Sequence, residues 1–315
     1  MKLKLNRRQF TRNISLGIAA LGLSRITSFS SPNKQPQVAI TMDDFDVYDT
    51  PTLSGMARNR AILAALNQHN LKASIFVTGK YVDNETNIAL LRLWNEAGHT
   101  IGNHTYSHWY YPDVSFQKYA ADILRNETLL KQLPRYRKYF RFPFLKEGNT
   151  GEQRDQMRAF LQDHGYRNGH VTIDASDWYV DGRLRERLKR DPKADLAPYR
   201  EFYLNHIWDR AIYYDNLSRE VLGRSARHTL LIHHNVLNGL FLNDLLQMFR
   251  NKDWGLIDSE EAYKDSVFSS APKIVPAGES IIWALAKETG RFDKILRYPG
   301  EDGDYEKPKM DKLKL

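Results

Sequence analysis

The sequence contains no cysteine among its 315 residues. A disulfide framework and a lipid-modified cysteine are therefore excluded, and the fold has to rely on its hydrophobic core. Any metal site must use histidine, aspartate or glutamate instead of thiolates. No internal repeat, low-complexity tract or long linker divides the chain. With 42% hydrophobic residues it can bury a full core, and one β/α barrel with insertions fits its length as well as two domains do.

Acidic residues are missing from the first thirty positions. Six basic residues lie there and carry most of the net charge of +8: Lys2, Lys4, Arg7, Arg8, Arg12 and Arg25. Without them, 40 basic residues face 38 acidic ones, which leaves a net charge of +2. A nearly balanced protein has no broad electrostatic attraction to phosphate backbones, so we expect no nucleic-acid partner.

Residues 1–30 predict an export signal. A basic start precedes an apolar stretch over residues 14–23, and Ser28-Phe29-Ser30 offers small residues for cleavage. Because the stretch is too short to span a bilayer comfortably, we expect no membrane span in the mature protein. Asn6-Arg7-Arg8-Gln9-Phe10 resembles the twin-arginine signal, which indicates a bacterial protein exported to the periplasm or beyond. An ordinary secretory signal or an uncleaved anchor is the alternative.

After residue 36, short β-rich runs alternate with segments of helical periodicity. The predicted strands are Val38–Thr41, Ala73–Val77, Thr100–Ile101, Tyr139–Phe142, His170–Ile173 and Thr229–Ile232. The predicted helices are Arg58–Asn67, Ile88–Glu96, Phe116–Gln132, Gln153–Asp163 and Ser280–Lys287. This rhythm predicts parallel strands with helical crossovers. Candidate polar residues follow the strand runs, where a β/α barrel gathers its active site.

Two later segments differ from this rhythm. Residues 181–227 are too long for a simple crossover and repeat apolar residues at helical spacing up to Gly223, which predicts an amphipathic helix on the barrel wall. The alternative is a sugar-stacking wall formed by Tyr199, Tyr203, Trp208 and Tyr213. Residues 297–315 are polar with few apolar positions, and we expect a loosely held tail.

Two histidines four residues apart, His104 and His108, directly follow a strand-like run. Each can give a ring nitrogen to one divalent cation, and a third ligand would leave a coordination position open for water. The acidic pair Asp43 and Asp44, at the end of another apolar run, is the candidate source of that ligand. Each feature alone is common on protein surfaces, so the two pairs indicate a metal site only together with the sequence around them.

That context is an ordered series of short segments: Thr41–Asp44, Ile75–Gly79, His104–His108, Phe140–Phe144, Asp174–Trp178 and Leu231–His233. The series resembles the polysaccharide deacetylase family, the carbohydrate esterases built on the NodB homology domain, and all five motif blocks of that family appear in order. The resemblance implies an α/β fold, an irregular (β/α) barrel over residues 31–296, with the helical insertion 181–227 before the last motif strand.

The resemblance also implies roles for ten residues. The metal would be held by Asp44, His104 and His108. The catalytic residues would be Asp43 as general base, Arg141 as its partner, His233 as general acid and Asp177 as the partner of His233. The oxyanion and acetyl pocket would be formed by the backbone N–H of Phe144 with the side chains of Trp178 and Leu231.

From these roles we expect a metal-dependent hydrolase that removes acetyl groups from an N-acetylated or O-acetylated polysaccharide or oligosaccharide. Zn²⁺ suits two imidazoles and one carboxylate, and Co²⁺ or Ni²⁺ also fits. The alternatives are a non-catalytic carbohydrate-binding protein and a metal hydrolase acting on a non-sugar amide. Protein partners and the identity of the glycan are not indicated.

Two positions leave alternatives open. The family usually follows its two acids with Gly-Pro, whereas Phe45-Asp46 stands here, which leaves the shape of the cleft undecided. Asp46 is an additional candidate for a ligand or a sugar contact. His234 directly follows His233, and the sequence does not decide which of the two histidines is the acid.

Overall fold

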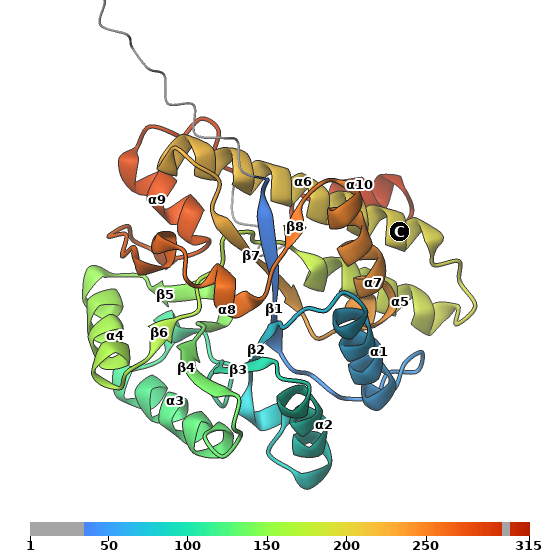
Figure 1. Ribbon diagram of the computed structural model, residues 1–315, viewed down its shortest axis with the longest axis horizontal. Coiled ribbons are helices and arrows are strands. Elements are labelled where there is room, and N and C mark those ends of the chain that lie inside the picture. Colours follow the sequence, from blue (N-terminus) through green and yellow to red (C-terminus); the bar gives the residue numbers. More distant parts are fainter. Residues whose placement is uncertain (1–34, 298–302) are drawn as a thin grey trace, which may run out of the picture. The chain divides into compact units, whose positions relative to one another are not determined.

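A curled parallel sheet forms the centre of the computed structural model, which describes residues 35–297 and 303–315 (Figure 1). In those ranges the strands are β1 (Gln37–Asp44), β2 (Ser74–Val77), β3 (Thr100–Asn103), β4 (Tyr136–Phe140), β5 (Lys146–Gly148), β6 (Arg167–Asn168), β7 (Arg227–His233), β8 (Gly255–Leu256) and β9 (Ala277–Gly278). The main sheet has the order β6-β4-β3-β2-β1-β7, with β8 also paired to β1, and its pairings are parallel. The antiparallel pair β5–β9 lies outside this sheet.

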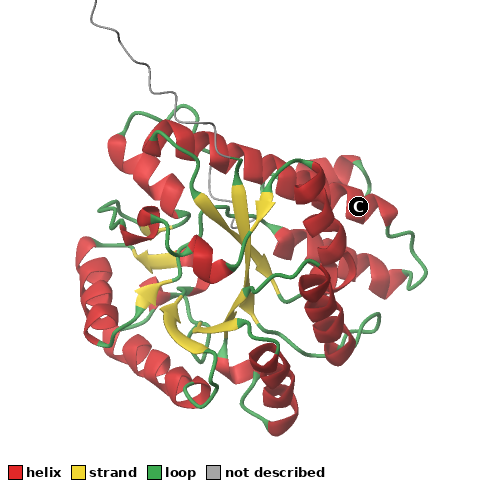
Figure 2. Cartoon of the chain, in the orientation of Figure 1, coloured by secondary structure: helices red, strands yellow, loops and turns green. Residues whose placement is uncertain are grey.

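Helices surround the strands (Figure 2). Within the described residues they are α1 (Gly55–Gln68), α2 (Glu85–Glu96), α3 (Phe116–Leu130), α4 (Gly151–Asp163), α5 (Asp177–Arg190), α6 (Ala197–Leu222), α7 (Val236–Asn251), α8 (Ser259–Ala262), α9 (Ile281–Thr289) and α10 (Lys307–Lys312). Side chains at several N-caps accept the first free backbone N–H groups, as Ser54 does for α1 and Asn235 for α7. The predicted α/β fold, an irregular (β/α) barrel with parallel strands and helical crossovers, is thereby confirmed, and its sheet is an open, curled one. None of these helices is long and apolar enough to cross a membrane.

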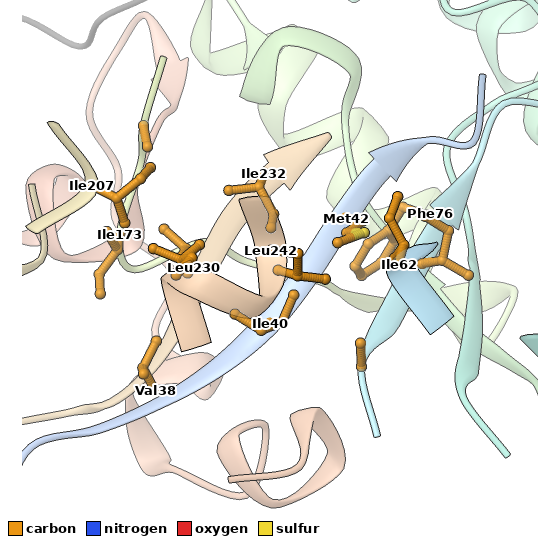
Figure 3. Packing of buried hydrophobic residues seen from close by; sticks show 14 of the residues in the cluster. Val38, Ile40, Met42, Ile62, Phe76, Ile173, Ile207, Leu230, Ile232 and Leu242 are labelled. Carbon is orange, nitrogen blue, oxygen red and sulfur yellow. The ribbon is translucent and has the colours of Figure 1, made fainter. Parts of the chain in front are cut away.

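The core lies between the central strands and the helices that cover them. β1 is buried along nearly its whole length, as expected of a strand covered on both faces. Ile40 and Met42 of this strand pack among Leu230, Ile232 and Leu242 (Figure 3). Because β1 and β7 are parallel and in register, with Asp43 opposite His233, the ends of both strands open on the same edge of the sheet.

The predicted strand His170–Ile173 is wrong. The structure has the short β6 earlier, at Arg167–Asn168, and only Ile173 makes an isolated bridge to Leu230. The cause is a contact between residues distant in sequence: the Thr172 hydroxyl donates to the carbonyl of Thr229 and accepts from its backbone N–H, and the backbone N–H groups of Thr172 and Ile173 share that carbonyl, so no regular ladder forms.

The insertion 181–227 is helical, and α6 ends at Gly223 in the left-handed conformation. The alternative of a sugar-stacking wall is wrong, because Tyr199 and Tyr203 are buried in the core. Trp208 packs on Trp254 with ring centroids 5.8 Å apart. The Tyr213 hydroxyl accepts a hydrogen bond from the backbone of residue 297. These aromatic side chains stabilise the packing of α6.

The C-terminal segment also differs from expectation. Residues 303–315 are not loosely held, because Met310 on α10 is fully buried and Glu306 is 2% exposed. Arg183 on α5 donates to Asp311, which adds a contact between α10 and the barrel. The polar composition of this segment did not predict that it docks, because one buried methionine and a few ion pairs are enough to hold a short polar helix against the protein. The predicted signal, residues 1–30, lies outside the described residues.

Candidate active site

The candidate metal ligands converge at the ends of β1 and β3. Asp44 is the last residue of β1, and His104 directly follows β3. A turn returns His108 toward the same point, because the Thr105 hydroxyl accepts the His108 backbone N–H. Asp44, Thr105 and His108 all have positive φ angles, between 56° and 75°. Non-glycine residues in this conformation store strain, which proteins concentrate at functional sites.

The three side chains form a tight ligand cluster. Oδ1 of Asp44 lies 3.1 Å from Nε2 of His108 and 3.5 Å from Nε2 of His104. One ligand atom from each residue lies within 4.8 Å of the others. The buried Oδ1 of Asp44 has no hydrogen-bond partner among the described residues. Nδ1 of His104 faces the carbonyl oxygen of Arg141 at 2.8 Å, which leaves Nε2 available to a cation. Two imidazoles and an unsatisfied carboxylate oxygen fit a divalent metal.

The electrostatics agree with this fit. Burial works against the charged carboxylate of Asp44, but His108 outweighs burial and lowers the pKa of Asp44 well below its usual range. Burial lowers the pKa of His104 to about 4, against the opposing effect of Asp43. An ionised carboxylate beside a neutral imidazole is the protonation state in which both groups bind metals.

Arg141 fixes the second acid, Asp43. Its NH1 donates to Oδ1 of Asp43 at 2.7 Å and to the Thr41 hydroxyl at 3.0 Å. Nε donates to the carbonyl of Gly169, and NH2 donates to the Tyr263 hydroxyl. Arg141 and Asp43 are both buried, so the guanidinium holds the carboxylate in one orientation.

His233 and Asp177 form a second pair, in which Asp177 is fully buried and His233 is partly exposed to the cavity. Nδ1 of His233 lies 2.7 Å from Oδ1 of Asp177, and the backbone N–H of His233 donates to Oδ2 at 2.9 Å. The amides of Asn235 and Asn238 also donate to Oδ2. Burial opposes the protonated imidazole, but Asp177 outweighs it and raises the pKa of His233 to about 10.

His233 and His234 are distinguished by their surroundings. His233 lines the cavity that contains Asp44, whereas the ring of His234 is buried. Nδ1 of His234 faces the carbonyl oxygen of Asp46 at 2.9 Å. Burial lowers the pKa of His234 to about 3, so it is a neutral structural group. Asp46 accepts the backbone N–H of Tyr48 and lies outside the ligand cluster of the described residues.

A cavity of about 280 Å³ unites the candidate residues. It is lined by Asp43, Asp44, His104, His108, Phe144, Leu145, Asp174, Ala175, Trp178, Leu231 and His233. Arg141 and Asp177 lie behind the lining, where Arg141 contacts Asp43 and Asp177 contacts His233. Phe144 has φ 58° and a side chain that is 51% exposed, and its ring lies 4.8 Å from that of His108. The structure therefore brings all ten residues named from the sequence to one place.

Sequence reasoning assigned no role to several neighbours of this site. Asp174 and Leu145 line the cavity and were given no role, although both lie in or directly beside the sequence segments that carry the family resemblance. Asn235 carried a signal, since a polar residue immediately before an apolar helical run is typical of an N-cap. Asn238, the third residue of α7, carried none. Tyr263 carried none, because only the tertiary fold brings its hydroxyl to Arg141.

Comparison with known proteins gives consistent matches. Residues 30–169 match the profile of the family described as polysaccharide deacetylase. A peptidoglycan N-acetylglucosamine deacetylase of Bacillus cereus is 33% identical over 153 residues, which are 48% of this chain and 50% of that protein. A second protein of the same name and organism is 29% identical over 56% of this chain and 68% of its own length. The chain thus spans only half the length of the first of these relatives.

Solved structures give the fold alone. The chitin deacetylase of Colletotrichum lindemuthianum matches with a TM-score of 0.50 and 21% identity, over 73% of this chain and 88% of that one. A CE4 family pseudoenzyme from Bacillus anthracis matches with a TM-score of 0.51 and 15% identity, over 73% and 66%. Residues 30–169 are thus similar in sequence to the polysaccharide deacetylase family, and the solved structures show a similar fold over a larger part of the chain.

Proposed function

We propose that this protein is a hydrolase that removes acetyl groups from an acetylated polysaccharide or oligosaccharide. The observation that carries the proposal is the pairing on the two sides of one cavity: Asp43 with Arg141, and His233 with Asp177, around the cluster of Asp44, His104 and His108. The family profile covers Asp43, the ligand cluster and Arg141, but it ends before Asp177 and His233. The proposed roles of those two residues rest on their contact with each other and on the place of His233 in the cavity.

Asp44, His104 and His108 would hold a divalent metal, with Zn²⁺ as the first choice for this ligand set. When bound, such an ion acidifies water and polarises the acetyl carbonyl. The buried Oδ1 of Asp44 supports the assignment, because its neighbours are the two ring nitrogens of His108 and His104, and a cation shared with them would neutralise the buried carboxylate.

Asp43 would act as general base. Arg141 occupies its Oδ1, while Oδ2 lies 3.8 Å from Nε2 of His104 and so points toward the ligand cluster. This oxygen would take a proton from the attacking water. The buried guanidinium allows one orientation of the carboxylate, which reduces the reorganisation needed during the reaction.

His233 would act as general acid. With Nδ1 engaged by Asp177, Nε2 is the ring nitrogen free to give a proton to the departing amine or alcohol. A pKa near 10 keeps the ring protonated at neutral pH, as this role requires. The backbone N–H of Phe144 would donate to the oxyanion, and Trp178 and Leu231 would contact the acetyl methyl group.

The substrate that we favour is an N-acetylated glycan of the cell wall, because the Bacillus cereus relatives are named peptidoglycan N-acetylglucosamine deacetylases. The proposed place of action is the periplasm or the cell exterior, based on the twin-arginine-like pattern in residues 1–30. In the proposed domain organisation, the barrel comprises residues 31–296 with the insertion 181–227, and residues 297–315 extend it.

The test is to incubate zinc-loaded protein with peptidoglycan, chito-oligosaccharides, acetylxylan and simple non-sugar acetamides while free acetate is measured. We expect release from at least one N-acetylated substrate and none from the Asp43→Asn variant, which should still bind metal. Binding of glycan and metal without acetate release from any substrate would favour the non-catalytic alternative. Release from simple non-sugar amides alone would favour the other alternative.

A further inference from the structure

The helical insertion contacts the His233–Asp177 pair through two buried residues of α6. Tyr203 and His206 lie three positions apart and therefore on one face of the helix. Neither is among the described residues that line the active-site cavity. Both nevertheless contact groups that hold Asp177, which makes them candidates for an indirect role in the reaction.

Tyr203 acts through Asn238. Its hydroxyl donates a hydrogen bond of 2.5 Å to Oδ1 of Asn238. The Nδ2 group of the same amide donates to Oδ2 of Asp177 at 2.8 Å and to the carbonyl of His233 at 2.9 Å. Because an amide has one oxygen and one nitrogen, a donor at Oδ1 fixes the orientation in which Nδ2 faces Asp177.

His206 acts through the backbone before Asp177. Its Nε2 accepts a hydrogen bond of 3.1 Å from the N–H of Ser176, the N-cap residue of α5. Nε2 must therefore be unprotonated, and the ring proton resides on Nδ1. That nitrogen lies 3.4 Å from Oε1 of Glu306, a carboxylate that the C-terminal segment inserts into the protein. A carboxylate at Nδ1 is a common means of fixing the tautomer of a histidine.

Glu306 has a second partner on the same helix as His206. Arg210 NH2 lies 3.5 Å from the same carboxylate oxygen, and Glu306 is 98% buried as a residue. Burial of a carboxylate is costly unless it is paired. Its partners here are a neutral histidine and an arginine of α6, so the segment 303–315 is joined to the helix that supports Asp177.

We propose that Tyr203, His206 and Glu306 are positioning residues for the general acid, which act through Asn238 and Ser176 on Asp177. The inference rests on the proposed function of His233. It gives the insertion and the C-terminal segment a shared role: they hold the carboxylate that orients the acid, while the opposite side of the cavity is held by Arg141.

The first test compares Tyr203→Phe with Tyr213→Phe. Both variants lose one hydrogen-bonding hydroxyl from α6, but the Tyr213 hydroxyl contacts only the backbone of residue 297 among the described residues. We expect Tyr203→Phe to lower kcat about tenfold with KM within about twofold, as for partial loss of a general acid. The alkaline pH at which kcat declines should also be lower for Tyr203→Phe than for the unaltered protein. Tyr213→Phe should change neither quantity.

The second test uses the acceptor at His206. His206→Leu removes the acceptor for the Ser176 N–H, whereas His206→Gln offers an amide oxygen in its place. We expect Leu to lower kcat and Gln to restore at least part of it. Glu306→Ala should lower kcat as His206→Leu does, but by less. Its control is Glu201→Ala, which removes an exposed acid from α6, the helix that contains His206.

A mutant cycle decides between positioning and general packing. In an Asp177→Asn background, Tyr203→Phe should lower kcat less than twofold further, because the residue through which it acts is already altered. A full tenfold loss in that background overturns the proposal. If the unaltered protein releases no acetate, the proposed function fails. The midpoint of the His233 ring titration, followed by NMR, then decides alone: a lower midpoint in Tyr203→Phe supports the positioning role, and an unchanged one overturns it.

Discussion

Asp177 contacts His233 twice, through Oδ1 to the ring Nδ1 at 2.7 Å and through Oδ2 to the backbone N–H at 2.9 Å. A single carboxylate therefore fixes the ring and the end of β7 together. Because Asp177 is also fully buried, its charge acts on the imidazole with little screening from water. Asp177 is consequently the main cause of the raised pKa of His233, with smaller contributions from Asp44 and Asp43, and this can be tested directly.

Replacement of Asp177 by asparagine should lower the pKa of His233 from about 10 toward the ordinary value near 6.5. The pKa is raised in the folded state, so the pair stabilises the fold fully below about pH 6.5, and this contribution disappears as pH rises toward 10. The stability difference between the metal-free protein and Asp177→Asn should therefore shrink over that window. NMR titration and urea unfolding at several pH values measure both effects. Equal ring titrations in the two proteins would contradict the prediction.

Removal of a ligand at the proposed metal site should weaken zinc binding. We expect His108→Ala to reduce affinity at least about 100-fold, since even residues that only support a ligand contribute about 10–100-fold. Isothermal titration with Zn²⁺ measures the change. His164→Ala, which alters a half-buried histidine outside the cluster, should leave affinity unchanged. Equal affinity of His108→Ala and the unaltered protein would exclude this ligand set.

The main strands and the site could be predicted because their determinants are local. Val38, Ile40 and Met42 form an apolar run that is long enough for a central strand, and the acids directly after it fall at the strand's carboxyl end. The spacing of His104 and His108 suited a shared metal before any fold was known. The family resemblance then separated the roles of Asp43 and Asp44, which spacing alone left open.

The parts that could not be predicted depend on tertiary contacts. The β-rich run that predicted a strand at His170–Ile173 contains no information on the hydroxyl of Thr172, which bonds to Thr229 across 57 positions. Similarly, the aromatic residues of α6 show the same helical spacing whether they face the core or a sugar. The docking of Glu306 onto α6 could not be read from a polar segment, because its partners lie nearly a hundred residues away.

The contribution of Phe144 should come from its backbone N–H more than from its ring. Phe144→Ala keeps that group, so we expect kcat within about threefold of the unaltered protein. KM should rise, because the half-exposed ring borders the cavity where a sugar would pack. Acetate release over a range of substrate concentrations separates the two parameters. A fall in kcat of about 100-fold or more, as found on loss of an oxyanion donor, would mean that the ring itself is needed.

Arg141 should be the most costly residue of the site to replace. Arg141→Met leaves the carboxylate of Asp43 buried without its cation, and it also removes donors to Thr41, Gly169 and Tyr263. Loss of one partner of a buried ion pair typically lowers the free energy of unfolding by about 3–5 kcal/mol, and we expect a value in this range from urea unfolding. The double variant Arg141→Met with Asp43→Asn should recover part of that loss, because no uncompensated charge remains. If the double variant is no more stable than Arg141→Met, the destabilisation comes from the lost hydrogen bonds and packing, and the ion pair with Asp43 is not its cause.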